Sequence, residues 1–204
     1  MANTPIFTIG HSTHPLDDFV TLLRQHRIEF VIDVRSTPYS RRMPQFNKEN
    51  LQLELRDRAI RYAHMPNEFG ARRTEAELYG AERRVDFGRV RDTDIFRRGV
   101  ERLKHGAAQG CRIALMCSEA DPFDCHRFSM ISYQLAKEGL RIKHILRNGA
   151  LIDNRALEER LREHYKFTSQ ADMFNSEESE AKQIEQAYRL RGEEIAYSTA
   201  GEGA

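Results

Sequence analysis

Short apolar runs alternate with amphipathic segments along most of the chain. Five apolar runs have the length and the β-branched content of buried strands: PIFTIG, EFVIDVRS, IRYAHMP, CRIALMC and LRIKHILRNG. The segments between them place apolar residues three or four positions apart, as a helix with one buried face requires: HPLDDFVTLLRQHRI, NKENLQLELRDRAI, DTDIFRRGVERLKHGAAQG and CHRFSMISYQLAKEG. This alternation predicts a single α/β domain of three layers, with a central, mostly parallel sheet of five strands.

Two segments depart from the alternation. Residues 67–92 are polar, and they predict either a lid over a site or a plain surface insertion, with a short helix capped by Thr74. From residue 168 onward charged residues dominate, so we divide the chain into an α/β domain over 1–167 and a charged, partly flexible helical tail over 168–204. The tail has one narrow apolar stripe, suited to packing on the body or on a partner chain: Ala181, Ile184 and Tyr188.

Polar residues follow four of the predicted strands at the point where each strand ends. These groups are Gly10-His11-Ser12, Asp33-Val34-Arg35-Ser36, Cys117-Ser118-Glu119 and Asn148-Gly149. Parallel strands of a wound sheet end at one edge, and ligands bind at that edge. Ordinary turns are rich in Asn, Asp, Gly and Ser, whereas His, Arg and Cys together are uncommon there. We therefore expect the four groups to converge on a site.

The overall composition narrows the class of function. The 204 residues include 32 basic and 31 acidic side chains, and the net charge of +1 gives no general attraction to nucleic acid or to an anionic membrane. No apolar run reaches the roughly 18 residues of a membrane span, and the first residues lack the pattern of a signal peptide. Three cysteines do not suit a disulfide framework. We therefore expect a cytoplasmic protein with reduced thiols and no membrane partner.

The segment MCSEADPFDCHR, residues 116–127, concentrates the most reactive side chains of the chain. Cys117 leaves the fourth predicted strand, and Asp124 is placed to cap a helix whose first residues are Cys125, His126 and Arg127. The free backbone amides of such a loop and the dipole of the helix favour an anion, and they lower the pKa of a thiol. The segment therefore predicts a cradle for a thiolate, or for an anionic substrate beside one.

Several motifs together resemble a known family. TIGHS, DVRSTPYSR followed by FN, MCSEADPFDCHR and HILRNG are similar, in this order, to the family of domain of unknown function 488, over about residues 5–167. That family has no established activity. The resemblance implies that its signature positions are His11, Asp33, Arg35, Arg41, Cys117, Glu119, Cys125, His126 and Arg127. A more distant likeness to rhodanese-like domains rests on Asp-Val-Arg and on a strand that ends in cysteine, although the loop from cysteine to arginine is longer here and acidic.

These observations predict an enzyme with its site at the carboxyl edge of the sheet. Cys117 is either the nucleophile or a metal ligand, and Glu119 and His11 are the acid–base candidates. We expect a small anionic substrate that is phosphate-bearing or nucleotide-like. The residues predicted to bind it are Asp33, Arg35, Arg41, His126 and Arg127.

A metal centre is one alternative. Zinc or iron would use thiolate and imidazole ligands from Cys117, Cys125, His126 and His11, with Glu119 as another possible donor. Successive residues of a helix point about 100° apart, however, so Cys125 and His126 in a helix would not easily share one ion. From the sequence we therefore predict no bound metal. The alternative that the thiols are ordinary packing residues stays open.

A binding module without turnover is the other alternative. Arg41, Arg42 and Lys48 are interleaved with Tyr39 and Phe46, a mixture that suits a stacked and clamped nucleotide or single strand. Nucleic acid therefore stays open as a partner, beside the small anionic substrate.

Overall fold

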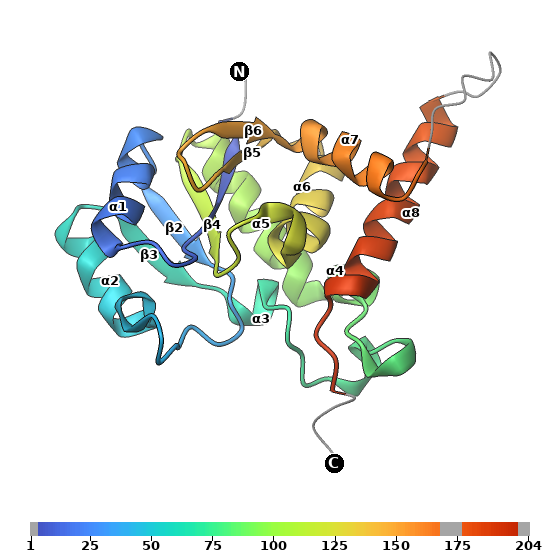
Figure 1. Cartoon of the computed structure of the whole chain (residues 1–204), viewed down its shortest axis with the longest axis horizontal. Helices are drawn as coiled ribbons and strands as arrows, with labels where there is room; N and C mark the ends of the chain where they lie inside the picture. The colour runs from blue at the N-terminus through green and yellow to red at the C-terminus, as the bar shows by residue number, and fades with distance from the viewer. Residues whose placement is uncertain (1–3, 168–176, 200–204) are drawn as a thin grey trace.

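A computed structural model of the chain describes residues 4–167 and 177–199, and one sheet lies at its centre (Figure 1). Within these residues six strands pair in the order β3-β2-β4-β1-β5-β6. From β3 to β5 the neighbours are parallel, whereas β6 is antiparallel to β5. The strands are β1 (Ile6–Gly10), β2 (Phe30–Asp33), β3 (Arg61–His64), β4 (Ile113–Cys117), β5 (Ile142–Ile145) and β6 (Leu151–Asp153).

Eight α-helices and one π-helix accompany this sheet in the described parts of the chain. The α-helices are α1 (Leu16–Gln25), α2 (Lys48–Asp57), α3 (Pro66–Phe69), α4 (Phe87–Arg91), α5 (Asp94–Ala108), α6 (Tyr133–Lys137), α7 (Asn154–His164) and α8 (Glu177–Ile195). The π-helix, Arg127–Ser132, continues directly into α6.

The prediction of an α/β fold is confirmed, but the number of strands is wrong. The five predicted strands are all present, and β6 is the sixth. It has only three residues, and it lies at the edge of the sheet with two of its three residues exposed. Such a strand has neither an apolar run nor a buried alternating face, so the apolar pattern does not reveal it.

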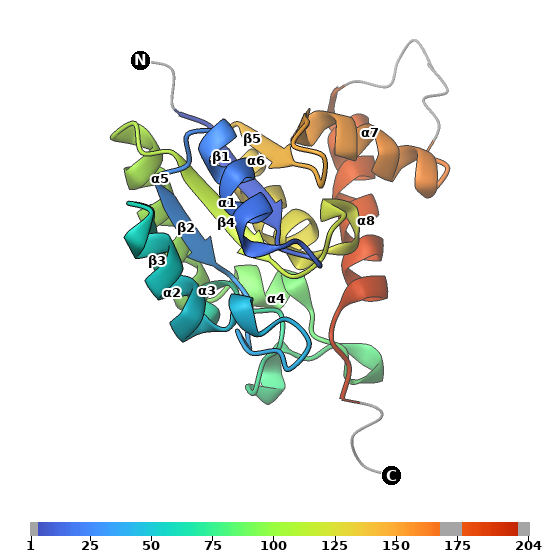
Figure 2. The same ribbon diagram turned by 60° about the vertical axis from the view of Figure 1, so that its left-hand side comes forward.

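Helices cover both faces of the sheet, which gives the predicted three layers (Figures 1 and 2). On one face α1 and α2 pack on the sheet through Phe19, Leu23, Leu51 and Leu55. On the other face α5 and the segment of the π-helix and α6 bury a second set of apolar residues, which includes Phe96, Val100, Met130 and Leu135.

A third cluster joins the end of the chain to the body. Phe123, Phe128 and Tyr133 pack there against α7 and against Ala187 and Tyr188 of α8. In the predicted apolar stripe of the tail, Tyr188 is buried, Ile184 is partly buried and Ala181 is exposed. The helix expected in the tail is thus present and rests on the body. Residues 168–176 and 200–204 of the tail lie outside the described residues, and the domain boundary at 167 stays a prediction.

The polar stretch 67–92 does not form the predicted helix capped by Thr74. It contains most of α3, two short 3-10 turns (Ala76–Leu78 and Ala81–Arg83) and α4. A single bridge pairs Tyr79 with Val85. Leu78, Val85 and Phe87 of this stretch are buried in the main core, so the polar composition conceals a packed insertion.

Across the described residues, no helix combines the length and the apolar content that a membrane span requires.

Candidate metal centre

Three of the four polar groups meet at the carboxyl edge of the sheet, as expected from parallel strands. The backbone amide of His11 donates to the carbonyl of Cys117 at 2.9 Å. The amide of Val34 donates to the carbonyl of Met116 at 3.0 Å. The ends of β1, β2 and β4 are therefore bonded together.

The fourth group makes a local turn instead. The side chain of Asn148 accepts from the amide of Ala150, and the carbonyl of Gly149 accepts from His26 at the end of α1. The neighbouring Arg147 donates hydrogen bonds to the hydroxyls of Ser12 and Thr13, in the loop after β1. The turn after β5 thus supports the loop after β1 from its outer side.

Gly10 allows the loop after β4 to lie directly on β1. A Cβ atom at position 10 would stand 1.7 Å from the carbonyl oxygen of Glu119 and 2.8 Å from its carbonyl carbon. Both are backbone atoms, which a side-chain rotation cannot move. The close approach therefore requires glycine, and it fixes where the loop between Cys117 and Cys125 runs.

The start of the helix after this loop differs from the prediction. Asp121, rather than Asp124, caps the short 3-10 turn Pro122–Asp124, because its carboxylate accepts from the amide of Phe123 at 2.9 Å. Cys125 is extended, with φ −135° and ψ 141°, and the helical backbone begins only at His126. Cys125 and His126 therefore do not diverge as successive residues of a helix would.

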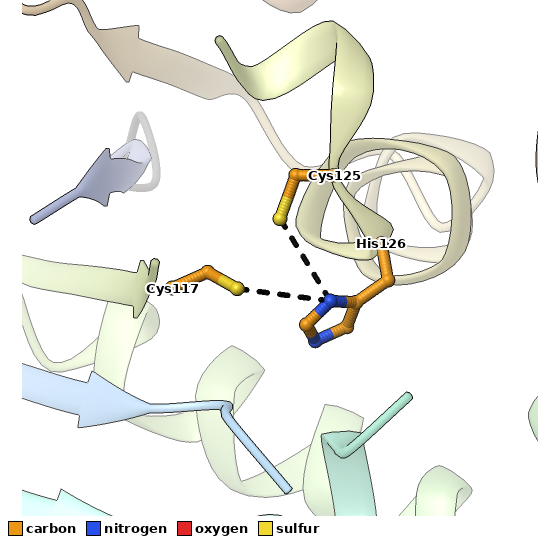
Figure 3. Close-up of side chains that lie close together, drawn as sticks. All are labelled: Cys117, Cys125 and His126. Atoms are coloured by element: carbon orange, nitrogen blue, oxygen red, sulfur yellow. Dashed lines mark hydrogen bonds between the residues drawn. The ribbon is translucent and has the colours of Figure 1, made fainter. Parts of the chain in front are cut away.

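Because of this extended residue, three donor atoms converge on one point (Figure 3). The Nδ1 atom of His126 lies 3.8 Å from the sulfur of Cys117 and 3.7 Å from the sulfur of Cys125. All three atoms lie within 4.8 Å of one another. The two thiols are buried, and so is most of the imidazole. These residues come from the end of β4 and from the turn that leads into the π-helix.

The imidazole of His126 is oriented by the backbone of β2. Its Nε2 atom lies 3.2 Å from the carbonyl oxygen of Val34, which can only accept. Nε2 therefore carries the proton, and Nδ1 presents its lone pair to the two sulfurs. A backbone carbonyl holds many metal-binding histidines in the same way.

The distances match tetrahedral metal coordination. With Zn–S of about 2.3 Å and Zn–N of about 2.0 Å, a tetrahedral ion separates sulfur from nitrogen by about 3.5 Å. The two observed S···N distances, 3.7 and 3.8 Å, are close to that value. A single ion placed between them would bind all three donor atoms at once.

The pKa values of the two thiols shift in opposite directions. The hydrogen bond to Cys125 and burial raise the pKa of Cys117. Burial alone would raise the pKa of Cys125, but the bond from Cys117 and the charge of Arg127 outweigh it and lower that pKa. Of the two thiols Cys125 therefore has the lower pKa, whereas the sequence pointed to Cys117.

Arg127 is fully buried, and its guanidinium supports the loop. The two Nη atoms donate to the carbonyls of Glu119 and Ala120 at 2.9 and 3.2 Å, and its amide lies 3.5 Å from the sulfur of Cys125. No carboxylate lies within 4.0 Å of it among the described residues. The charge of this buried guanidinium is one of the causes that lower the pKa of the Cys125 thiol.

Arg35 belongs to a second buried network beside this cluster. Its guanidinium donates twice to the carboxylate of Asp33, at 2.6 and 2.9 Å, and also to the carbonyl of Phe46. The same carboxylate accepts from the hydroxyl of Tyr62 at 2.7 Å. The network fixes the backbone on both sides of Val34, so it supports the carbonyl that orients His126.

His11 lies in the network of Arg35 rather than in the sulfur cluster. Its Nδ1 donates to the carbonyl of Ser12 at 2.9 Å, and its Nε2 accepts from Arg35 at 3.1 Å. The ring stacks on Phe46 with 4.3 Å between centroids. Burial and the charge of Arg35 lower its pKa to about 4. The imidazole is thus neutral near pH 7, and both of its nitrogens have partners.

The remaining two predicted site residues, Glu119 and Arg41, are exposed. Partial burial of the Glu119 carboxyl and the nearby Cys125 raise the pKa of Glu119. The carbonyl of Val34 was not among the predicted site groups, because a backbone carbonyl has no sequence signature. Phe46, considered above as a ring for stacking a nucleotide, is fully buried and stacks on His11 instead.

Comparison with known proteins yields one match. The model of the family described as domain of unknown function DUF488 matches residues 15–135, which hold the metal-ligand candidates and most of the buried network. No curated protein and no solved structure matches the chain, so the distant likeness to rhodanese-like domains finds no support there. Because the matched segment is more than half of the chain, the protein belongs to the DUF488 family.

Proposed function

We propose that the protein is a zinc protein whose ion is held by Cys117, Cys125 and His126. One observation carries this proposal: Nδ1 of His126 lies 3.7–3.8 Å from both sulfurs while its Nε2 is anchored on a carbonyl. Two thiolates and one imidazole suit zinc better than magnesium or calcium, which prefer oxygen ligands.

Three protein ligands leave one tetrahedral position open, the arrangement of catalytic rather than structural zinc sites. A water molecule in that position would be acidified by the ion and would serve as a nucleophile near neutral pH. Glu119, two residues after Cys117, is the acid–base candidate closest along the chain. The reaction class that fits is therefore hydrolysis or hydration, with Glu119 moving the proton.

The earlier hypothesis of a nucleophilic cysteine on an anionic substrate has less support. The guanidinium groups of Arg35 and Arg127 already donate hydrogen bonds to protein oxygens. Those donors are therefore not available to bind an anion. Arg41 is the exposed cation of that predicted set.

Metal analysis of the purified protein tests the proposal. We expect one zinc per chain after loading, and we expect cobalt to give the intense thiolate-to-metal absorption of a tetrahedral site. Cys117→Ser, Cys125→Ser and His126→Ala should each weaken zinc binding by more than about 100-fold, because each removes a ligand. Cys111→Ser is the matched control, since that third thiol lies outside the cluster and should leave binding unchanged. If the wild-type protein held no metal after incubation with zinc or cobalt, the proposal would be overturned.

A further inference from the structure

The turn that carries the two adjacent ligands is held from outside by α7 and α8. The ring of Phe123 is buried between two guanidinium groups, with its centroid 4.1 Å from Cζ of Arg160 and 4.5 Å from Cζ of Arg191. Arg160 also pairs with the carboxylate of Asp121 at 2.8 Å. Arg160 and Arg191 therefore hold the short turn Pro122–Asp124 in place.

Arg191 bonds to the two residues that precede Cys125. Its Nε donates to the carbonyl of Phe123 at 3.1 Å, and its Nη2 donates to the carboxylate of Asp124. The side chain is only 11% exposed. These two bonds hold one backbone carbonyl and one side chain of the turn just before Cys125, the residue whose extended backbone makes the donor atoms converge.

The helix that carries Arg191 is seated by Tyr188. The tyrosine ring lies 4.9 Å from that of Phe128, and its hydroxyl bonds to Glu158 at 3.0 Å and to Asn154 at 3.1 Å. Figures 1 and 2 show α8 running alongside the turn and the end of α7. The family match ends at residue 135, so this contact comes from a part of the chain beyond the matched segment.

We propose that Arg191 of the tail is a positioning residue for the metal centre. By holding the Phe123 carbonyl and the Asp124 carboxylate, it keeps Cys125 and His126 in register with Cys117. This inference rests on the proposed zinc function. It makes the tail part of the functional unit rather than an appendage, because without α8 the turn keeps only the contacts of Arg160 and loses those of Arg191.

The test compares Arg191→Gln with Arg191→Lys and with the matched control Arg189→Gln. Arg189 lies on the same helix, is 61% exposed and, among the described residues, pairs only with Glu193. Zinc affinity is measured by competition with a chromogenic chelator, and the cobalt spectrum reports the geometry of the site. The glutamine variant should bind zinc about 10–100-fold more weakly, as other outer-shell changes do. The lysine variant should recover part of that loss, because it keeps the charge but not the planar fork.

Thermal unfolding of the zinc-free variants separates positioning from general destabilisation. Arg191→Gln should change the cobalt spectrum at temperatures far below its own unfolding transition, and Arg189→Gln should retain wild-type affinity and spectrum. Wild-type zinc affinity in Arg191→Gln, or an equal loss in Arg189→Gln, would contradict the inference.

A second measurement distinguishes the failure of this inference from that of the zinc proposal. In the zinc-free protein with Cys111→Ser, the rate of Cys125 alkylation by iodoacetamide reports whether the turn is held. Arg191→Gln should raise this rate several-fold even if no metal ever binds. If wild type binds no zinc, the zinc proposal fails, whereas an unchanged alkylation rate shows that Arg191 does not position the turn.

Discussion

The carbonyl oxygen of Val34 and Nε2 of His126 are joined at 3.2 Å across 92 positions of the chain. This bond connects the end of β2 to the first residue of the helix after β4. It makes the orientation of one imidazole depend on the backbone around Val34, which the buried pair of Asp33 and Arg35 holds in place. Substitution of Asp33 or Arg35 should therefore affect the proposed metal binding, although neither residue is a ligand.

Asp33→Asn should destabilise the fold strongly. It leaves the guanidinium of Arg35 buried without its carboxylate, which costs about 3–5 kcal/mol of unfolding free energy. Urea unfolding followed by circular dichroism measures the loss. Asp92→Asn is the control, because its pair with Arg97 is exposed on both sides and should be worth only about 0–1 kcal/mol. Equal effects of the two substitutions would show that burial of the pair does not matter.

Gly10→Ala should displace the loop after Cys117. The added methyl group would meet the backbone of Glu119 at 1.7 Å, so the loop must move away from β1. We expect a loss of about 1–3 kcal/mol in stability, as for other overpacked sites, together with weaker zinc binding. Gly80→Ala serves as the control, since the nearest atom to its Cβ lies 3.7 Å away. Unchanged zinc affinity in Gly10→Ala would contradict the tight contact.

The stability of the zinc-free protein should fall as the pH drops below about 6.5, partly because of His144. Burial lowers the pKa of this histidine from 6.5 to about 3, and its two nitrogens bond to Thr8 and Asn154. Between these two values the unfolded chain binds a proton that the folded chain does not. The contribution of His144 to the free energy of unfolding is therefore fully present above pH 6.5. Below pH 6.5 it falls by about 1.4 kcal/mol per pH unit.

Urea midpoints of wild type and His144→Gln at pH 7, 6 and 5 check this slope. The glutamine variant should be less stable at pH 7 but should depend less on pH. The exposed His105, changed to glutamine, should leave the wild-type slope in place. If His144→Gln lost stability with pH as steeply as wild type, another group would be responsible.

Tyr188→Phe should loosen α8 on the body. The change removes a hydroxyl that bonds to Asn154 and Glu158 in a buried place, which costs about 1–3 kcal/mol. Hydrogen exchange of the amides of α8 should accelerate more than that of the sheet. Tyr39→Phe is the control, because that ring is 63% exposed and should have no measurable effect.

Much of the fold could be predicted because burial leaves a periodic trace in the sequence. The apolar runs that became β1, β2, β4 and β5 are buried through most of their length. The convergence of His11, Arg35 and Cys117 at one edge follows from parallel topology alone. The exposed edge strand β6 leaves no such trace, and so it was missed.

The proposed metal centre could be predicted only in composition. Its geometry depends on one residue, Cys125, which is extended rather than helical. The local sequence predicted Asp124 as the cap of a helix that includes Cys125, whereas the structure has a cap at Asp121 and long-range contacts of Phe123 with α7 and α8. Such tertiary contacts leave no local pattern in the sequence.

The central position of β1 has a consequence for synthesis of the chain. This strand is synthesised before both of its neighbours in the sheet, Ile113–Cys117 and Ile142–Ile145. Thr8 bonds to a partner 136 positions later. A nascent chain must therefore keep this apolar segment uncovered until both later strands have been made, and folding through such distant pairings is slow.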